Sequence, residues 1–408
     1  MKITQVDVIP ILPRLNTAAG RKPWFSQIDR RTIFRVQADN GLVGYGDRRD
    51  VAQSRSEVEH LIGRDPFDFV GNTFDPGLGA ALYDLMGKFL EVPAYKLMGP
   101  KVRDTVSVAA WTALATPAQF AAEISRAASQ GYRTFKMHTA PFQDVLEQTR
   151  AAAQVAPEHF RIHYDFNGSR TLGAVLPLLR ELEQHPVVGY IEDPLPKNDP
   201  DGWCRLRDKS RLPLIFHITA THGSLPQLTA GCADIYLLSA LSVGDALMTG
   251  AACARANAQL LLQLTGGTLT KACALHLAAV LPTATAHSIH LDDQYEEDVT
   301  VARIPVEDGA SPVPEEPGLG VEVDEERLED LASRAAAAAE PRRCVGVFTM
   351  PGGRRYYTPA VPPVARLTGR EEGTIRGIST ELWEDDGSEA FAEVYERVAK
   401  DGSFEAED

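Results

Sequence analysis

The stretch RIHYDFNGSRTLGAVLPLLRELEQHPVVGYIEDP (161–194) contains the unit from which the fold can be predicted. A short β-type run (161–166) is followed by a Leu-rich helical stretch (174–184) and then by a second β-type run (188–192). A carboxylate stands at or next to the end of each run, Asp165 in the first and Glu192 in the second. The pattern predicts a strand–helix–strand unit with acidic side chains at the carboxyl ends of neighbouring strands.

The same unit recurs from about residue 105 to residue 300. Eight β-type runs alternate with Ala- and Leu-rich helical stretches, which is typical of a (β/α) barrel. A doubly wound open sheet shares this alternation, but no Gly-x-Gly-x-x-Gly segment opens any of the helices, so the barrel is preferred. The eight runs are 106–110, 134–138, 161–166, 188–192, 214–217, 234–238, 260–263 and 286–291.

Two further regions flank this repeat. Residues 1–100 begin with alternating runs at 3–11 and 32–43, and helical segments follow, which predicts an α+β unit. Beyond the repeat, the chain contains an acidic helix near 325–338 and an amphipathic helix at 389–399. This last region carries too many large apolar side chains for a disordered tail.

The composition is that of a globular protein and excludes several classes of function. Hydrophobic residues make up 44%, and 41 Lys+Arg against 56 Asp+Glu give a net charge of −15. Nucleic acids and anionic membrane surfaces attract basic proteins, so neither is an expected partner. No run approaches 18 apolar residues, the first residues predict a strand instead of a signal peptide, and the five cysteines are scattered. We therefore expect a cytoplasmic protein without a disulfide framework.

Candidate catalytic side chains stand at the carboxyl ends of the predicted strands, where (β/α) barrels place their active sites. The second strand ends in Lys136-Met-His138, and its period of two puts both polar side chains on one face. An ammonium beside an imidazole favours neutral His138, which suits a general base; the alternative is a strand end that reaches solvent. The third strand ends in Asp165-Phe-Asn167, and His163, one layer deeper, is interpreted as a core histidine.

The spacing of the candidates indicates that they converge. Gaps of 29, 27 and 25 residues separate successive members of the set Lys136, Asp165, Glu192 and His217. Each gap is about one strand–helix unit, so the four side chains come from consecutive strands and meet at the barrel mouth. Carboxylates on adjacent strands provide the oxygen ligands of a hard divalent cation, although either could instead cap the following helix.

Two more features stand near the predicted mouth. Gly266 and Gly267 open the helix after the seventh strand, where exposed backbone N–H groups suit a carboxylate or phosphate; the alternative is a simple tight turn. His290 lies near the end of the eighth strand and is a candidate for the same site.

Taken together, these motifs resemble the enolase superfamily, in its mandelate racemase and muconate lactonizing enzyme branch. The resemblance runs through most of residues 1–330 and implies an α+β capping domain over a modified (β/α)₇β barrel. It also implies Mg²⁺-assisted abstraction of the proton α to a carboxylate. The matching pieces are Gly44-Tyr-Gly-Asp47, Ala81–Lys88, Pro93–Pro100, Lys136-x-His138, Asp165-x-Asn167-Gly, Glu192-Asp-Pro-Leu-Pro and Pro317-Gly-Leu-Gly-Val-Glu322.

By this resemblance, Lys136 and His138 occupy the acid/base positions, and Asp165 and Glu192 match the first two metal ligands. The fifth strand of relatives ends in a third acidic ligand, but here it ends in Phe216-His-Ile-Thr219. Either Ile218 replaces that ligand or His217 stands in for it with a shift of one residue, and Thr219 faces the same way as His217. An imidazole ligand would favour Mn²⁺ or a later metal over Mg²⁺.

The resemblance also bears on the reaction. The sixth strand lacks the second base of relatives, and the seventh has Gln263 where a racemase places its partner histidine. One base suffices for dehydration, so a hydroxy-acid or sugar-acid dehydratase is preferred over a racemase. The alternative function is a barrel that has lost catalysis and binds acids. Predicted substrate contacts are Asn167, Gln263, Gly266, Gly267 and His290.

The resemblance further implies three parts: a capping domain (1–104), a catalytic barrel (105–305), and a segment (306–408) that returns to the cap and continues as an extension. The polar loop 16–27, with Arg21, Lys22 and Trp24, is expected to close over the barrel. The apolar residues of the extension are expected to pack on the cap or on a neighbouring subunit. Homo-oligomers are expected because such barrels often associate.

Overall fold

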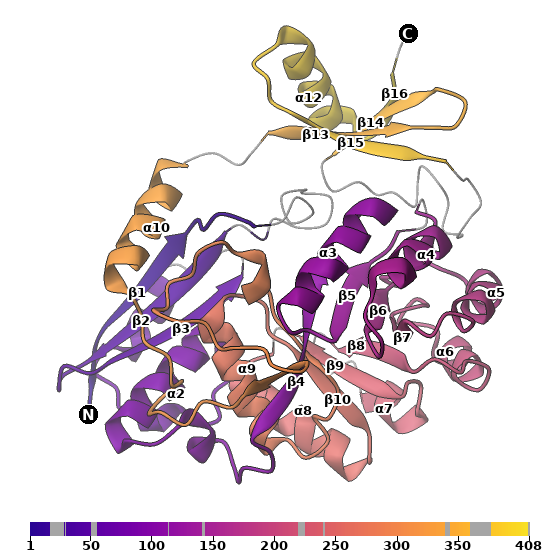
Figure 1. Ribbon diagram of the computed structural model, residues 1–408. Coiled ribbons are helices and arrows are strands. Elements are labelled where there is room, and N and C mark those ends of the chain that lie inside the picture. Colours follow the sequence, from indigo (N-terminus) through magenta and orange to yellow (C-terminus); the bar gives the residue numbers. More distant parts are fainter. Residues whose placement is uncertain are drawn as a thin grey trace.

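Figure 1 shows the computed structural model of the protein. The structure describes residues 1–16, 28, 30–49, 55–112, 114–140, 143–218, 225–239, 241–338, 343–359 and 377–406. The predicted closing loop therefore lies outside the described residues except for Asn16, and so does Thr219. Within the described chain, no helix combines the length and the apolar character that crossing a bilayer requires.

In the described part of the chain, eight parallel strands close into a barrel, which confirms the predicted fold class. The strands pair in sequence order, and the last also pairs with the first through Ser288 and Val108. The strands are β4 (Thr105–Thr112), β5 (Thr134–His138), β6 (Arg161–Asp165), β7 (Val188–Glu192), β8 (Leu214–Ile218), β9 (Ile235–Ser239), β10 (Gln259–Gln263) and β11 (Ser288–Ile289).

Helices cross over between consecutive strands and cover the outside of the barrel (Figure 1). Several begin at side-chain caps: Thr116 and Gln119, for example, form a reciprocal capping box at the start of α3. The helices are α3 (Pro117–Ser129), α4 (Val145–Val155), α5 (Leu172–Leu182), α6 (Pro200–Arg207), α7 (Leu225–Ala230), α8 (Val243–Arg255) and α9 (Thr268–Val280).

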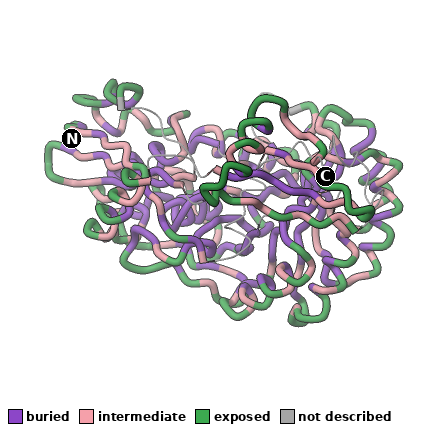
Figure 2. Tube along the Cα trace, turned by 90° about the horizontal axis from the view of Figure 1, so that it is seen from above, coloured by how far each residue is buried: buried purple, intermediate pink, exposed green. Residues whose placement is uncertain are grey.

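Alternation along the barrel strands produces two apolar layers. In β8, Ile215 belongs to the cluster that fills the barrel interior, together with Leu237 of β9. Phe216 and Ile218 of the same strand belong instead to the larger cluster under the helices. Figure 2 shows the resulting concentration of buried chain in the middle of the molecule, with exposed segments at its rim. Side chains of the interior layer face the barrel axis, so polar residues of this layer at the strand ends line the barrel mouth.

An antiparallel sheet forms the core of the N-terminal region. Its strands are β1 (Ile3–Ile11), β2 (Arg31–Ala38) and β3 (Val43–Arg49), and helix α2 (Pro76–Leu90) packs on β3. Gly46 allows this close packing, because a Cβ there would collide with the carbonyl oxygen of Gly77. Shorter elements complete the region: α1 (Arg55–Val58), η1 (Glu59–Leu61), η2 (Pro66–Phe69) and η3 (Ala94–Leu97).

Buried charges join this sheet to the barrel. The Arg31 guanidinium lies 2.5 Å from Asp47 and 2.8 Å from Asp298. The two carboxylates in turn accept backbone N–H groups at the start of α9, Asp47 from Gly267 and Asp298 from Thr268. All three charged side chains are fully buried, so the cap and the barrel share one ion-pair network. We call it the Arg31 network.

After the barrel, the chain returns to the cap. Segment η5 (Asp292–Gln294) follows β11, and β12 (Ala310–Pro312) pairs antiparallel with β4. Helix α10 (Glu325–Ala337) then packs against β1, with the carbonyl oxygen of Leu331 accepting the N–H of Leu12. The predicted division of the chain, with boundaries at 104 and 305, remains a prediction.

The C-terminal extension forms a small α+β unit of its own. Its strands β13 (Cys344–Thr349), β14 (Arg355–Pro359), β15 (Ser379–Glu384) and β16 (Phe404–Glu405) form one antiparallel sheet, beside helix α12 (Glu389–Asp401). Phe348 packs on Leu114, which follows β4, and Ala140 after β5 borders the contact. The extension thus contacts barrel loops, and Figure 1 shows it above that end of the barrel. Phe348 thus packs on a barrel loop instead of the cap, because Leu114 supplies apolar surface there, and the alternative of packing on a neighbouring subunit remains a prediction.

Candidate active site

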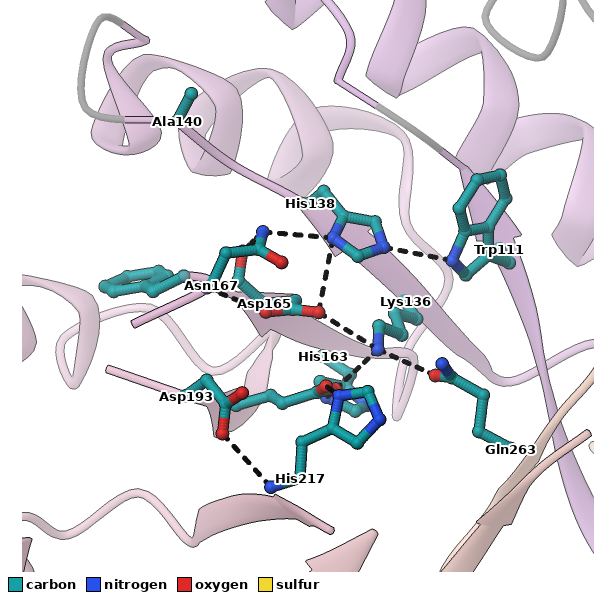
Figure 3. Close-up of polar contacts among 12 residues, drawn as sticks. Trp111, Lys136, His138, Ala140, His163, Asp165, Asn167, Asp193, His217 and Gln263 are labelled. Carbon is teal, nitrogen blue, oxygen red and sulfur yellow. Dashed lines mark hydrogen bonds and ion pairs between the residues drawn. The ribbon is translucent and has the colours of Figure 1, made fainter. Parts of the chain in front are cut away.

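Lys136 lies at the centre of the polar cluster at the barrel mouth (Figure 3). Its side chain is fully buried, and its Nζ lies 2.6 Å from Glu192 Oε2 and 3.1 Å from Asp165 Oδ2. It also donates a hydrogen bond of 2.8 Å to Gln263 Oε1. Burial opposes the charged form, but the two carboxylates outweigh it and raise the pKa of Lys136. Lys136 is therefore an ammonium at neutral pH.

His138 stands on the same face of β5, two residues on. Its Nε2 accepts the indole N–H of Trp111 at 3.2 Å, and its Nδ1 lies 3.2 Å from Asp165 Oδ2. Because an indole can only donate, the neutral ring carries its proton on Nδ1, facing Asp165. Burial, helped by the positive charge of Lys136, holds the pKa of His138 well below its usual range. The imidazole is therefore neutral, with one basic nitrogen.

Asp165 and Asn167 complete the environment of that ring. The backbone N–H of Asn167 donates to Asp165 Oδ1 at 2.8 Å, and its side-chain nitrogen lies 3.2 Å from His138 Nδ1. Asn167 adopts a left-handed backbone with φ of 51°, which turns the chain back over the strand end. Burial and the charge of Glu192 raise the pKa of Asp165 well above its usual range.

Glu192 is surrounded by nitrogen donors. Its Oε2 lies 2.7 Å from His163 Nε2 as well as near the Lys136 ammonium, and its Oε1 lies 3.2 Å from His217 Nδ1. Burial alone would favour protonation, but the charge of Lys136 outweighs it and holds the pKa of Glu192 well below its usual range. Glu192 is therefore the ionised carboxylate of the cluster.

The end of β8 places two neighbouring residues on opposite sides. His217 shares the inner face with Ile215 and approaches Glu192, whereas Ile218 is buried under the helices. Of the two sequence alternatives for the third ligand, His217 is thus the one that lies beside the acidic cluster. Asp193 lies there too, and its Oδ1 accepts the backbone N–H of His217 at 3.0 Å.

The remaining predicted contacts lie at different distances from this cluster. Gln263 joins it through Lys136, as described above. The N–H of Gly267, by contrast, is bound to Asp47 in the Arg31 network, so this donor already has an acceptor. His290 Nδ1 lies 3.3 Å from the carbonyl oxygen of Leu264, and no contact of His290 with the cluster is found among the described residues. The substrate roles of Gly266, Gly267 and His290 remain predictions.

Comparison of the sequence with known protein families identifies the family of this chain. Residues 119–327, which include every side chain of the cluster except Trp111, match the enolase C-terminal domain-like family. The match covers half of the chain. The protein belongs to the enolase superfamily, in its mandelate racemase and muconate lactonizing enzyme branch.

Individual members of the superfamily are more distant. An N-succinyl-L-Arg/Lys racemase of Bacillus cereus is 27% identical over 244 residues, which cover 53% of this chain and 66% of that protein. A D-galactonate dehydratase of Verminephrobacter eiseniae is 27% identical over 248 residues, or 52% of this chain and 60% of that protein. The chain thus spans at most about two thirds of these curated relatives.

Solved structures agree on the fold. A Pseudomonas fluorescens enolase with bound magnesium, potassium and tartrate superposes with a TM-score of 0.70 at 22% identity, covering 83% of this chain and 94% of that one. The structure of the Bacillus cereus racemase gives a TM-score of 0.68 at 21% identity, with coverage of 81% and 98%.

Three residues of this cluster are not among the site residues predicted from the sequence. Trp111 pairs with Lys136 in the register of β4 and β5. This neighbour relation can be recognised only once the strand pairing is known. His163 was assigned to the core, yet it contacts Glu192. Asp193 follows Glu192 directly, and simple strand alternation would place it on the opposite face. Its φ of 43° breaks that alternation.

Proposed function

We propose that the protein removes the α-proton of a small hydroxy-acid or sugar-acid carboxylate and thereby dehydrates the acid. The observation that carries the proposal is the neutral, buried His138 beside the Lys136 ammonium. A neutral imidazole accepts a proton, and a fixed ammonium nearby stabilises the negative charge that develops on the substrate.

In this proposal, His138 Nε2 takes the α-proton once the indole N–H of Trp111 releases that nitrogen. Lys136 orients the substrate carboxylate, and Asn167 and Gln263 contact the substrate from β6 and β10. The protonated His138 then donates to the departing β-hydroxyl group, which leaves as water. The product enol becomes a 2-keto-3-deoxy acid.

The proposed cofactor is a divalent cation, Mg²⁺ or Mn²⁺, with Asp165, Glu192 and His217 as the ligands inferred from the sequence. When bound, such an ion would neutralise charge on the substrate carboxylate. The residues present fit a cation, because Glu192 is ionised and its buried Oε1 receives no hydrogen bond within the described chain.

Dehydration is favoured over racemisation because the described ends of β9 and β10 provide no second base opposite His138. Strands β9 and β10 end in Ser239 and Gln263, and neither side chain accepts a proton near neutral pH. A two-base racemase needs a second group on the opposite face of the enolate. The racemase and dehydratase relatives are compatible with either outcome.

A screen of hydroxy and sugar acids with Mg²⁺ or Mn²⁺ tests the proposal. We expect at least one acid to be converted to a 2-keto-3-deoxy acid with release of water. Inversion of an α-carbon without loss of water would show a racemase instead.

The second candidate function is acid binding without turnover. It is favoured by the absence of an acidic side chain at the described end of β8, where Ile218 points outward. Saturable binding of acids with no conversion, at any metal concentration, would support this candidate. We also propose that the protein forms homo-oligomers and that its domains meet near residues 104 and 305.

A further inference from the structure

Two of the five cysteines are in contact on the helical side of the barrel. Cys204 belongs to α6, and Cys232 lies between α7 and β9. Their Sγ atoms are 3.6 Å apart, which is ordinary contact for two sulfur atoms, although the residues are 28 positions apart in the chain. Both are free thiols in the structure. A disulfide bond is about 2.05 Å long, so a side-chain rotation and a small approach of the two segments would allow one to form.

Each thiol also faces a carbonyl oxygen of the other segment. Cys204 Sγ lies 3.6 Å from the carbonyl oxygen of Ala230, and Cys232 Sγ lies 3.7 Å from that of Pro200. These crossed contacts show that the backbone of each segment already lies close to the other cysteine. Because a thiol is a weak hydrogen-bond donor, little is lost when both sulfurs give up their hydrogens.

The two sulfurs differ in access and in acidity. Cys204 is partly exposed, whereas Cys232 is fully buried. Burial, together with the contact with Cys204, raises the pKa of Cys232 to about 12, and the charge of Arg207 opposes that increase. The thiolate is the reactive form of a cysteine, so a dissolved oxidant meets Cys204 first. Once Cys204 has reacted, its contribution to the raised pKa of Cys232 is lost, which favours the second step.

We propose that Cys204 and Cys232 form a reversible disulfide when the protein meets a low-molecular-weight disulfide such as oxidised glutathione. The Cys204 thiolate attacks one sulfur of the oxidant, which forms a mixed disulfide and releases one glutathione thiolate. Cys232 loses its proton to solvent and attacks Cys204 Sγ, which releases the second glutathione. The two cysteines are thereby oxidised, glutathione disulfide is reduced to two thiols, and the two cysteine protons balance the two released thiolates.

The bond would connect consecutive strand–helix units of the barrel. Trp203, next to Cys204, packs on Phe216 of β8 with ring centroids 4.9 Å apart. Cys232 leads into β9, so the crosslink closes a loop that contains β8 and α7. A crosslink restricts the unfolded chain, and we therefore expect the oxidised protein to unfold at a higher temperature. This inference does not depend on the proposed function.

Incubation of the reduced full chain with oxidised glutathione tests the proposal. Wild type is compared with Cys204→Ser, with Cys232→Ala and with the control Cys253→Ala, which removes a different buried thiol, in α8. The products are mapped by mass spectrometry after the remaining thiols have been alkylated. Thermal unfolding of each reduced variant verifies that it is folded.

We expect wild type and Cys253→Ala to lose two hydrogens and to give a linked peptide that contains Cys204 and Cys232. Cys232→Ala should stop at a glutathione adduct on Cys204, and Cys204→Ser should stay unmodified at Cys232 because that thiol is buried. The melting temperature of oxidised wild type should rise by a few degrees, and dithiothreitol should reverse the rise. Cys204→Ser should show no such shift.

The same measurements can refute each part of the proposal. A wild-type adduct on Cys204 that never resolves, or thiols that stay reduced in excess oxidised glutathione, would overturn the disulfide. An adduct on Cys232 in Cys204→Ser would contradict the order of attack. A disulfide that leaves the melting temperature unchanged, or lowers it, would refute the stabilising effect.

Discussion

Single buried side chains at this barrel have properties that their residue types alone do not predict. His276 in α9 illustrates the effect on stability: its Nε2 lies 3.2 Å from the carbonyl oxygen of Leu319, and burial lowers its pKa to about 4. Between pH 6.5 and 4 the unfolded chain therefore binds a proton at this site that the folded protein does not. The free energy of unfolding should fall by about 3 kcal/mol over that range because of His276 alone.

His276→Gln, which keeps a donor for the Leu319 carbonyl, should remove this part of the pH dependence. Chemical denaturation at pH 7 and at pH 4.5 measures it. The largely exposed His159 provides the matched control, since His159→Gln should leave the acid-side loss unchanged. An equally steep loss of stability in His276→Gln would show that other groups dominate.

At the scale of elements, the alternating runs of the sequence predicted the barrel strands closely. A run with a period of two indicates a strand, and polar residues at its end indicate which end of that strand lies at the barrel mouth. The last strand is shorter than expected: β11 covers Ser288–Ile289 within the predicted run 286–291. The site was less predictable. Trp111 and His163 lie at the site because of the register of their strands, and Asp193 because of its own left-handed backbone. Neither the register nor this backbone conformation can be predicted from a hydrophobic pattern.

The extension gives a prediction at this same scale. Its own core contains Val345, Phe391 and Val398, separate from the barrel core. Phe391→Ala should destabilise the extension by about 3 to 5 kcal/mol and leave the barrel transition in place, so calorimetry should show an early, separate transition. Glu405→Gln, at an exposed hydrogen bond with Tyr356, is the control. A single transition that shifts as a whole to lower temperature in Phe391→Ala would mean that the extension and barrel unfold together.

At the scale of the whole molecule, the Arg31 network connects the cap to the barrel. Asp298 is held ionised there: burial opposes its charge, but Arg31 outweighs burial and lowers the pKa of Asp298 to about 2. Asp298→Asn leaves a buried guanidinium short of one partner and should reduce the free energy of unfolding by about 3 to 5 kcal/mol.

Denaturant unfolding at neutral pH measures this loss. Arg35→Gln breaks partly exposed pairs with Asp7 in the same sheet and with Glu325 of α10, and should cost no more than about 1 kcal/mol for each pair. Equal losses in the two variants would mean that the Arg31 network does not couple the cap to the barrel.

The proposed role of His138 is removal of the α-proton of a small acid. It is tested most directly by NMR of the acid selected in the screen, incubated in D₂O with wild type and with His138→Gln. We predict that the α-proton signal is lost with wild type and that its loss slows by about 10²-fold or more in the variant, with the Lys136 cluster still folded. Loss of the α-proton at the wild-type rate in His138→Gln would contradict the account.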